Sequence, residues 1–69
     1  MRLTLRAIQQ LKRADAENNW VLPRISDGMV QSFDVTNEAT AKYLNTRSRN
    51  YLSAGTFWDI WQEEEAQHK

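Results

Sequence analysis

Few residues in this chain have side chains that could carry out catalysis. The only histidine is His68, next to the last residue, and there is no cysteine. Terminal residues are the least ordered part of most domains, so His68 is poorly placed for proton transfer. The aspartates Asp27, Asp34 and Asp59 are far apart in the sequence, and no glycine-rich loop could hold a phosphate. We therefore expect no catalytic residue, no bound metal, no cofactor and no enzymatic activity.

Aromatic and acidic side chains are concentrated near the C-terminus, in the stretch FWDIWQEEE. Phe57, Ile60 and Trp61 are spaced i, i+3 and i+4, which predicts one buried helix face. Trp58 is rotated by about 100° from Phe57, so it either lies against the hairpin or is exposed. An exposed tryptophan is a common hot spot of protein interfaces.

Three glutamates follow these aromatic residues directly. Carboxylates near the C-terminal end of a helix oppose its dipole, so they do not stabilise the helix that carries them. Either residues 63–69 form a frayed acidic tail, or the acids meet a basic surface on a partner. The candidate protein-interface residues are Trp58, Trp61, Glu63 and Glu64.

Basic residues form two groups. One lies in the segment TRSRN, and the other lies along a polar face of the predicted N-terminal helix. Each group is either a solvated surface or a surface that contacts phosphates or an acidic partner. The candidate nucleic-acid-binding residues are Arg47, Arg49, Asn50, Arg2, Arg6 and Arg13.

The segment 37–55 approaches the spacing of a helix–turn–helix. Ala41, Tyr51 and Ala54 occupy the small and hydrophobic positions around a turn at Asn45. This pattern predicts a second helix that would enter a DNA groove. The alternative without DNA binding is that the two helices only cover the hairpin and that the basic residues lie in the turn between them.

The runs TAKYLN and RSRNYL also resemble the AAxYLG…SRxxxxxL run of excisionase-type winged helices. The sequence departs from that pattern at Asn45, where glycine is usual, and at Thr46, where an apolar residue is usual. The resemblance implies DNA binding, with Arg47, Arg49 and Asn50 at the start of the recognition helix.

The stretch 20–44 has a second resemblance, to the arm-type DNA-binding domain of tyrosine recombinases. In that family a small sheet precedes a helix that begins near a Phe-x-Thr-x-x-Glu-Ala run, which Phe33, Thr36, Glu38 and Ala39 approximate. The family has a third strand where this sequence predicts a helix. The resemblance implies contact between the sheet and DNA, for which the outer face of the sheet would need basic residues.

The element that must position these groups is a β-hairpin over residues 20–35. A central Asp-Gly pair between two runs of β-branched and aromatic residues predicts a type I′ turn. The register then pairs Ile25 with Val30 and Leu22 with Phe33, and it places most of the large apolar side chains on one face of the hairpin. That face consists of Trp20, Leu22, Met29, Phe33 and Val35.

Two segments next to the hairpin are predicted to be helices. Residues 3–17 carry an apolar stripe, and Thr4 is placed to cap their N-terminus. Residues 36–45 begin with a Thr-Asn pair, either of which is a suitable cap, and Asn45 is expected to end that helix in the left-handed conformation. The apolar stripe consists of Leu3, Ala7, Ile8, Leu11 and Ala14.

The remaining signals complete the expected fold. A short YLSA helix is expected to end at Gly55, and Thr56 is expected to cap the last helix. Pro23 cannot donate a hydrogen bond to a neighbouring strand, so the first strand is expected at the edge of the sheet. The predicted fold class is α+β: one small domain over 1–69, with an N-terminal helix, a β-hairpin, and two to three short helices packed on the hairpin.

Composition limits the partners. The chain has 69 residues and a formal net charge of zero, so no overall field attracts nucleic acid or an acidic membrane. Most cations lie before residue 51, and most of the later charges are carboxylates. No apolar run approaches the roughly 20 residues of a membrane span, and the N-terminus does not resemble a secretory signal. We expect a cytoplasmic protein, of phage or bacterial origin.

These patterns favour a small non-enzymatic interaction protein that binds a larger protein partner and modulates it as an adaptor or an inhibitor. The expected state is a monomer or a weak homodimer, without a membrane or a cofactor. The alternative is a small DNA-binding regulator with an excisionase-like helix–turn–helix at 37–55.

Overall fold

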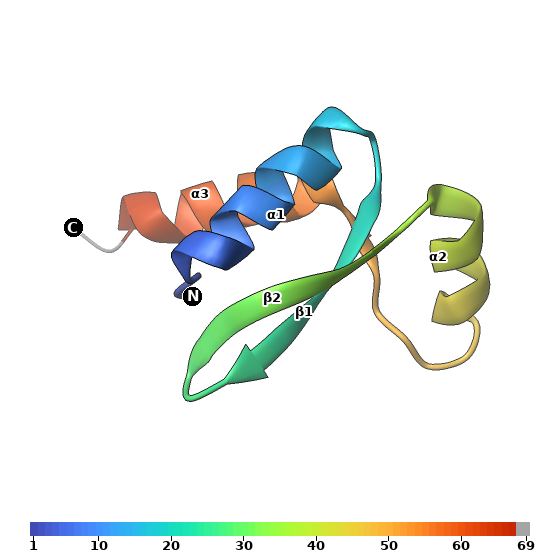
Figure 1. Ribbon diagram of the computed structural model, residues 1–69, viewed down its shortest axis with the longest axis horizontal. Coiled ribbons are helices and arrows are strands. Elements are labelled where there is room, and N and C mark those ends of the chain that lie inside the picture. Colours follow the sequence, from blue (N-terminus) through green and yellow to red (C-terminus); the bar gives the residue numbers. More distant parts are fainter. Residues whose placement is uncertain (68–69) are drawn as a thin grey trace.

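The computed structural model describes residues 1–67 of the chain and has the predicted α+β fold. Its elements are α1 (Leu5–Ala16), β1 (Trp20–Ser26), β2 (Met29–Thr36), α2 (Glu38–Asn45), β3 (Leu52–Ser53) and α3 (Ala54–Gln67). The helices α1 and α3 lie on one side of the hairpin, and α2 lies at the opposite end of the molecule (Figure 1). The N-terminal helix, the hairpin and two further helices confirm the predicted fold class.

The hairpin turn forms where the sequence predicts it. Asp27 and Gly28 have positive φ angles of 55° and 73°, as a type I′ turn requires of both central residues. The flanking residues Ser26 and Met29 are paired. Glycine is needed at the second position because positive φ is unfavourable for residues with a Cβ atom.

A β-bulge after the turn overturns the predicted faces of the hairpin. Ile25 pairs with Val30 as predicted, but Gln31 has no partner in β1, and Arg24 pairs with Ser32. One extra residue in β2 shifts each later pair by one position, so side chains that were expected on one face are separated. Among the predicted apolar face only Phe33 is buried, and the other buried strand residues are Val21 and Val30.

The N-terminal helix α1 also forms as predicted. The Oγ1 atom of Thr4 accepts a hydrogen bond from the N–H of Ala7 (3.2 Å) and caps the helix. Asn18 has a positive φ of 57° and turns the chain toward β1. The apolar stripe faces inward: Leu3, Ala7, Leu11 and Ala14 are buried, and Ile8 packs half-buried against them.

The helices α1 and α3 run antiparallel over one face of the sheet. At one end the N–H of Ala54 donates to the carbonyl of Asn19 (2.9 Å). At the other end the ammonium group of Met1 lies 3.5 Å from the carboxylate of Glu64. Between these ends lies the core, which consists of Leu3, Ala7, Leu11, Ala14, Val21, Val30, Phe33, Ala54 and Phe57.

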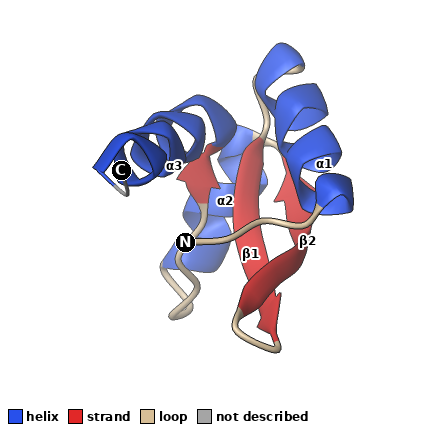
Figure 2. Ribbon diagram, turned by 90° about the vertical axis from the view of Figure 1, so that its left-hand side faces the viewer, coloured by secondary structure: helices blue, strands red, loops and turns tan. Residues whose placement is uncertain are grey.

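The strand order is β2-β1-β3, so β1 is the central strand and not the edge strand that Pro23 led us to expect. The extra strand β3 replaces the predicted YLSA helix and pairs only with Trp20 and Val21 of β1 (Figure 2). Pro23 lies beyond this short partner, so its missing N–H falls where β1 has no neighbour on that side. The local argument about proline was right, but the position of the strand was wrong.

The outer edge of β2 is covered by the N-terminal segment and by α1. The N–H of Val30 donates to the carbonyl of Arg2 (2.8 Å), and its carbonyl accepts from the N–H of Thr4 (3.0 Å). The N–H of Phe33 donates to Oε1 of Gln10 (2.8 Å). These bonds use backbone groups that an open strand edge would otherwise offer to another chain.

Candidate functional site

The helix α3 begins at Ala54 because Ser53 caps it. The N–H of Thr56 donates to Oγ of Ser53 (3.3 Å), which in turn donates to Oγ1 of Thr56 (2.7 Å). Ser53 is therefore the N-cap, and the prediction of Thr56 was wrong. Gly55 lies inside the first turn, where a Cβ atom would be 3.1 Å from Oδ1 of Asp15. Its lack of a side chain leaves room for that carboxylate at the end of α1.

The inward face of α3 differs from the predicted one. Phe57 is buried, and its ring packs edge-on against Phe33 with ring centroids 5.0 Å apart and planes at 84°. Ile60, which we expected in the core, is 39% exposed. Trp58, whose place the sequence left open, turns toward the core together with Trp61. The inward face consists of Ala54, Phe57, Trp58 and Trp61, and Ile60 lies beside it, because this is the side of α3 that packs against α1 and the core.

Trp58 and Trp61 form an aromatic pair at the margin of the core. Their ring centroids are 5.3 Å apart with planes at 69°, and both side chains are half-buried. The indole Nε1 of Trp61 is shielded from solvent and has no hydrogen-bond acceptor among the described residues. Large aromatic side chains that are partly in the core and partly in solvent are well suited to bind a further surface.

The helix that carries this aromatic pair also carries several exposed carboxylates. Asp59, Glu63 and Glu65 are exposed, and residues 54–67 contain no lysine or arginine. Of these acids and Glu64, only Glu64 has an ion-pair partner within residues 1–67. We call the following residues the acidic α3 surface: exposed Asp59, Ile60, Glu63 and Glu65, with half-buried Trp58 and Trp61.

The helix continues to Gln67, whereas the sequence predicted a frayed tail over 63–69. Residues 63–67 are therefore part of a regular helix, which gives their side chains defined directions. His68 and the rest of the predicted tail lie outside the described residues.

The helix α2 is capped by Asn37, whose Oδ1 accepts from the N–H of Thr40 (2.8 Å). Ala41 is fully buried, and α2 lies on the side of the sheet away from α1 and α3 (Figures 1 and 2). Tyr43 is 58% exposed. The helix thus has a small buried contact and a large solvent-facing surface.

The chain leaves α2 through a fixed turn. The N–H of Arg49 bonds to the carbonyl of Leu44 (3.3 Å), and Ser48 has a positive φ of 70°, as in a Schellman motif. Asn45, predicted to be the left-handed residue, is instead the last residue of α2. Its side chain accepts from the N–H of Tyr51 (2.7 Å) and donates to the carbonyl of Tyr51 (3.0 Å). The turn is therefore held at both ends.

Two arginines project from this turn. Nη2 of Arg47 donates to the hydroxyl of Tyr43 (3.1 Å), and its guanidinium carbon lies 5.5 Å from the centre of the tyrosine ring. Arg49 and Asn50 are exposed. Neither arginine has a carboxylate partner within the part of the chain that the structure describes. We call Tyr43, Arg47, Arg49 and Asn50 the basic turn.

The segment 37–55 does not form the predicted helix–turn–helix. After α2 the chain makes a turn and a loop and then enters β3, where Leu52 pairs with Val21. Because the chain is extended in β3, no recognition helix begins at Arg47. The resemblance to excisionase-type winged helices therefore fails at the element that would read DNA.

The sheet also lacks what the recombinase resemblance requires. The only cation within the three strands is Arg24, and its Nε atom lies 2.9 Å from Oδ2 of Asp34. A third strand is present, but it follows α2 and does not precede it. The strands therefore offer phosphates no cation without a carboxylate beside it.

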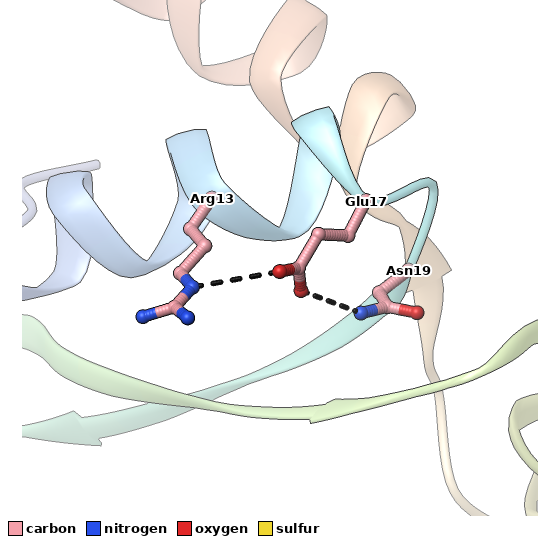
Figure 3. A network of polar contacts seen from close by, with 3 residues as sticks. All are labelled: Arg13, Glu17 and Asn19. Atoms are coloured by element: carbon pink, nitrogen blue, oxygen red, sulfur yellow. Dashed lines mark hydrogen bonds and ion pairs between the residues drawn. The ribbon is translucent and has the colours of Figure 1, made fainter.

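The basic residues of α1 and of the segment before it do not join the basic turn. Arg2, Arg6 and Arg13 are exposed. Nε of Arg13 lies 3.5 Å from the carboxylate of Glu17, which also accepts from Nδ2 of Asn19 at 3.3 Å (Figure 3). The helix α1 begins at the end of the molecule opposite to α2 (Figure 1). The six predicted nucleic-acid-binding residues are thus divided between two separate places.

A hollow of about 320 Å³ lies between the end of α1 and the start of α3. Of its two carboxylates, that of Glu38 lies 2.8 Å from Nζ of Lys42, and that of Asp15 lies against Gly55. Its lining contains no histidine that could pair with them. Within residues 1–67, no three histidine, aspartate or glutamate side chains lie close enough together to hold a metal ion.

Comparison of the chain with protein-family models, curated proteins and solved structures finds no match. None of the helices within residues 1–67 is long and apolar enough to cross a membrane. The acidic α3 surface and the basic turn are the features of the described molecule from which a function can be argued.

Proposed function

We propose that this chain is a small non-enzymatic interaction protein that binds a larger protein partner and modulates it, as an adaptor or an inhibitor. The observation that carries this proposal is the acidic α3 surface, where two half-buried tryptophans lie beside exposed carboxylates on a helix without a cation. Tryptophan is among the residues most enriched at the energetic centres of interfaces. One sign of charge around it selects a partner of the opposite sign.

The placement of the acids supports a use in binding. Glu63 and Glu65 lie in the C-terminal part of α3, where the helix dipole is negative, and each carboxylate there destabilises a helix by about 0.3–1 kcal/mol at low salt. Contact with a basic partner surface would reverse the sign of this contribution. A basic groove on a larger protein is therefore the expected binding site, and the absence of cysteine suits a reducing cytoplasm.

The first experiment is a tagged pull-down from a lysate of the source cells, with and without nuclease, followed by binding of the purified partner. Trp58→Ala should weaken partner binding by about 2 kcal/mol, roughly 30-fold. Asp59→Asn combined with Glu63→Gln should weaken it and reduce its dependence on salt. Glu17→Gln removes an exposed carboxylate just after the end of α1, away from α3, and serves as the control for loss of a surface charge.

If Trp58→Ala lowers stability, its effect on binding cannot be interpreted, and the double variant Asp59→Asn with Glu63→Gln becomes the test of the proposal. Asp59 and Glu63 are exposed and have no cationic partner among the described residues, so their replacement by amides should not lower the unfolding midpoint. Unaltered partner binding by that double variant, or an equal loss with Glu17→Gln, would remove the acidic α3 surface from the interface.

A small DNA-binding regulator is the second candidate, favoured by the exposed arginines Arg47 and Arg49. With no recognition helix formed, such contact would come from the turn itself. Two phosphate contacts predict a shallow salt dependence, with a slope of about −2 in log K against log salt. The pull-down would support this candidate if nucleic acid is recovered, if nuclease removes the associated proteins, and if Arg47→Ala with Arg49→Ala abolishes binding.

A further inference from the structure

The molecule carries two charged surfaces of opposite sign, and neither is neutralised within it. The basic turn lies in a stretch, residues 39–58, that contains no acid. The acidic α3 surface lies on a helix that contains no cation. Within the described residues, Arg47 and Arg49 have no carboxylate partner, and Asp59, Glu63 and Glu65 have no cationic one.

The basic turn is already in a fixed shape. Asn45 holds both backbone groups of Tyr51, and the bond from Arg49 to Leu44 closes the end of α2. Arg47 is oriented by the Tyr43 hydroxyl through one of its five N–H donors, which leaves the others free for a carboxylate. A surface that is ordered before binding loses little entropy on binding.

The two surfaces are far apart on an elongated molecule. The longest extent of the chain is 37 Å, and the turn after α2 lies at one end of it, while the C-terminal part of α3 lies at the other (Figure 1). No single copy can therefore bring them together. Two copies that lie side by side in opposite directions would place each turn against the α3 of the other. Such a two-fold arrangement makes the same contact twice and is closed.

We propose that the basic turn is a docking site for the acidic α3 surface of a second copy of this chain. The basic turn then binds the face of α3 on which the carboxylates of Asp59 and Glu63 lie about one helical turn apart, next to the exposed part of Trp58. Exposed ion pairs are individually weak. In a two-fold dimer, however, the second of the two equivalent contacts forms within the complex, at a high effective concentration, so the two contacts together bind more tightly than either alone. The resulting dimer is weak and sensitive to salt.

This inference goes beyond the proposed function, because it adds a competitor for the same surface. Self-association covers the acidic α3 surface, so the monomer is the form that is free to bind a partner. Rising protein concentration then lowers the fraction of chains available for that partner.

The test is sedimentation equilibrium of the full chain, free of nucleic acid, at about 20 mM and about 500 mM salt. The expected result is a reversible dimer at low salt, with a Kd that rises at least about tenfold at high salt. Arg47→Glu with Arg49→Glu should give a monomer, and so should Asp59→Arg with Glu63→Arg. An equimolar mixture of these two variants should restore a heterodimer, because both reciprocal contacts again join opposite charges.

The matched control is Arg6→Glu with Lys12→Glu, which makes the same change of charge on the exposed side of α1 and should leave the dimer intact. The proposal is overturned if the unmodified chain is monomeric at low salt, if the control disrupts the dimer equally, or if the mixture stays monomeric. It is also overturned if association requires nucleic acid that nuclease removes. The Arg47→Glu, Arg49→Glu variant keeps the acidic α3 surface, so its binding to a captured partner tests the proposed function separately.

Discussion

The acidic α3 surface and the basic turn are constructed in different ways, although each combines an aromatic side chain with charges of one sign. The outward residues of α3 belong to a helix whose inward side is core, with Phe57 against Phe33 and the two tryptophans at its margin. The basic turn is attached to α2, whose one fully buried residue is Ala41. Its shape is fixed by polar bonds at its two ends, one set of which ties it to the backbone of buried Tyr51.

This difference determines how binding and stability are coupled. On α3 the tryptophans Trp58 and Trp61 contribute both to the core and to the proposed interface, so truncating either of them should weaken binding and the fold together. In the turn, Tyr43 and Arg47 are exposed, and their removal leaves the core unchanged. Binding through α3 is therefore sensitive to local unfolding, whereas binding through the turn depends on a few hydrogen bonds.

The largest expected effect is that of Phe57→Ala in the core beneath the acidic α3 surface. Removal of a buried phenylalanine ring costs about 3–5 kcal/mol, including its edge-on contact with Phe33. A domain of 69 residues has a total stability of roughly 3–10 kcal/mol, so the variant should lose about a third or more of its free energy of unfolding, which thermal unfolding followed by circular dichroism would measure. Ile60→Ala, on the exposed side of the same helix, should cost less than about 1 kcal/mol. Equal losses would mean that the inward face of α3 is assigned wrongly.

The next effect tests the polar bonds that hold the basic turn. Asn45→Ala leaves the N–H and carbonyl of buried Tyr51 without their partners, which should cost about 1–3 kcal/mol in urea unfolding. Asn50→Ala removes an exposed amide from the same turn and should change stability by less than about 0.5 kcal/mol. Self-association should weaken in the first variant more than in the second. If both variants behave alike, Asn45 does not hold the turn.

The parts of this fold that follow from the sequence are those with a local physical cause. The Asp-Gly turn, the Thr4 cap and the apolar stripe of α1 each depend on residues within one or two turns of chain. The bulge at Gln31 does not, because the Gln31 carbonyl accepts from the hydroxyl of Thr4 (3.1 Å), 27 residues away. The strand β3 has only two residues and exists by pairing with β1, so no local signal distinguishes it from the start of a helix.

The candidate site was predicted in part for the same reason. The aromatic and acidic residues of α3 were found from composition, but which of Trp58 and Ile60 turns inward depends on the cap at Ser53 and on the packing of α1. The exposed pair of Tyr43 and Arg47 was missed as a unit. Their i, i+4 spacing was the available signal. The predicted helix–turn–helix instead grouped Arg47 with Arg49 and Asn50, the residues that follow it, and not with Tyr43, which precedes it.

A smaller effect of opposite sign is expected at Ser48. This residue has a positive φ of 70°, which is unfavourable for a residue with a Cβ atom and is the usual position of glycine after a helix. Ser48→Gly should therefore raise the free energy of unfolding by about 0.5–1 kcal/mol, and Ser48→Ala should not. The gain should appear without any change in self-association, because the shape of the turn stays the same. A loss of stability would show that the serine side chain makes a contact that matters more than its backbone strain.

The smallest effects compare the charges at two helix ends, one from each region. Glu38 is the first residue of α2 and lies 2.8 Å from Lys42, so Glu38→Gln should lower stability by about 0.3–1 kcal/mol. Glu65 lies near the end of α3 with no cationic partner in the described residues, so Glu65→Gln should raise stability by about 0.3 kcal/mol. Thermal unfolding at low salt should show the two shifts with opposite signs, and high salt should shrink both. If Glu65→Gln instead lowers the midpoint, the acids of α3 contribute to the fold, and the reason for assigning them to binding is lost.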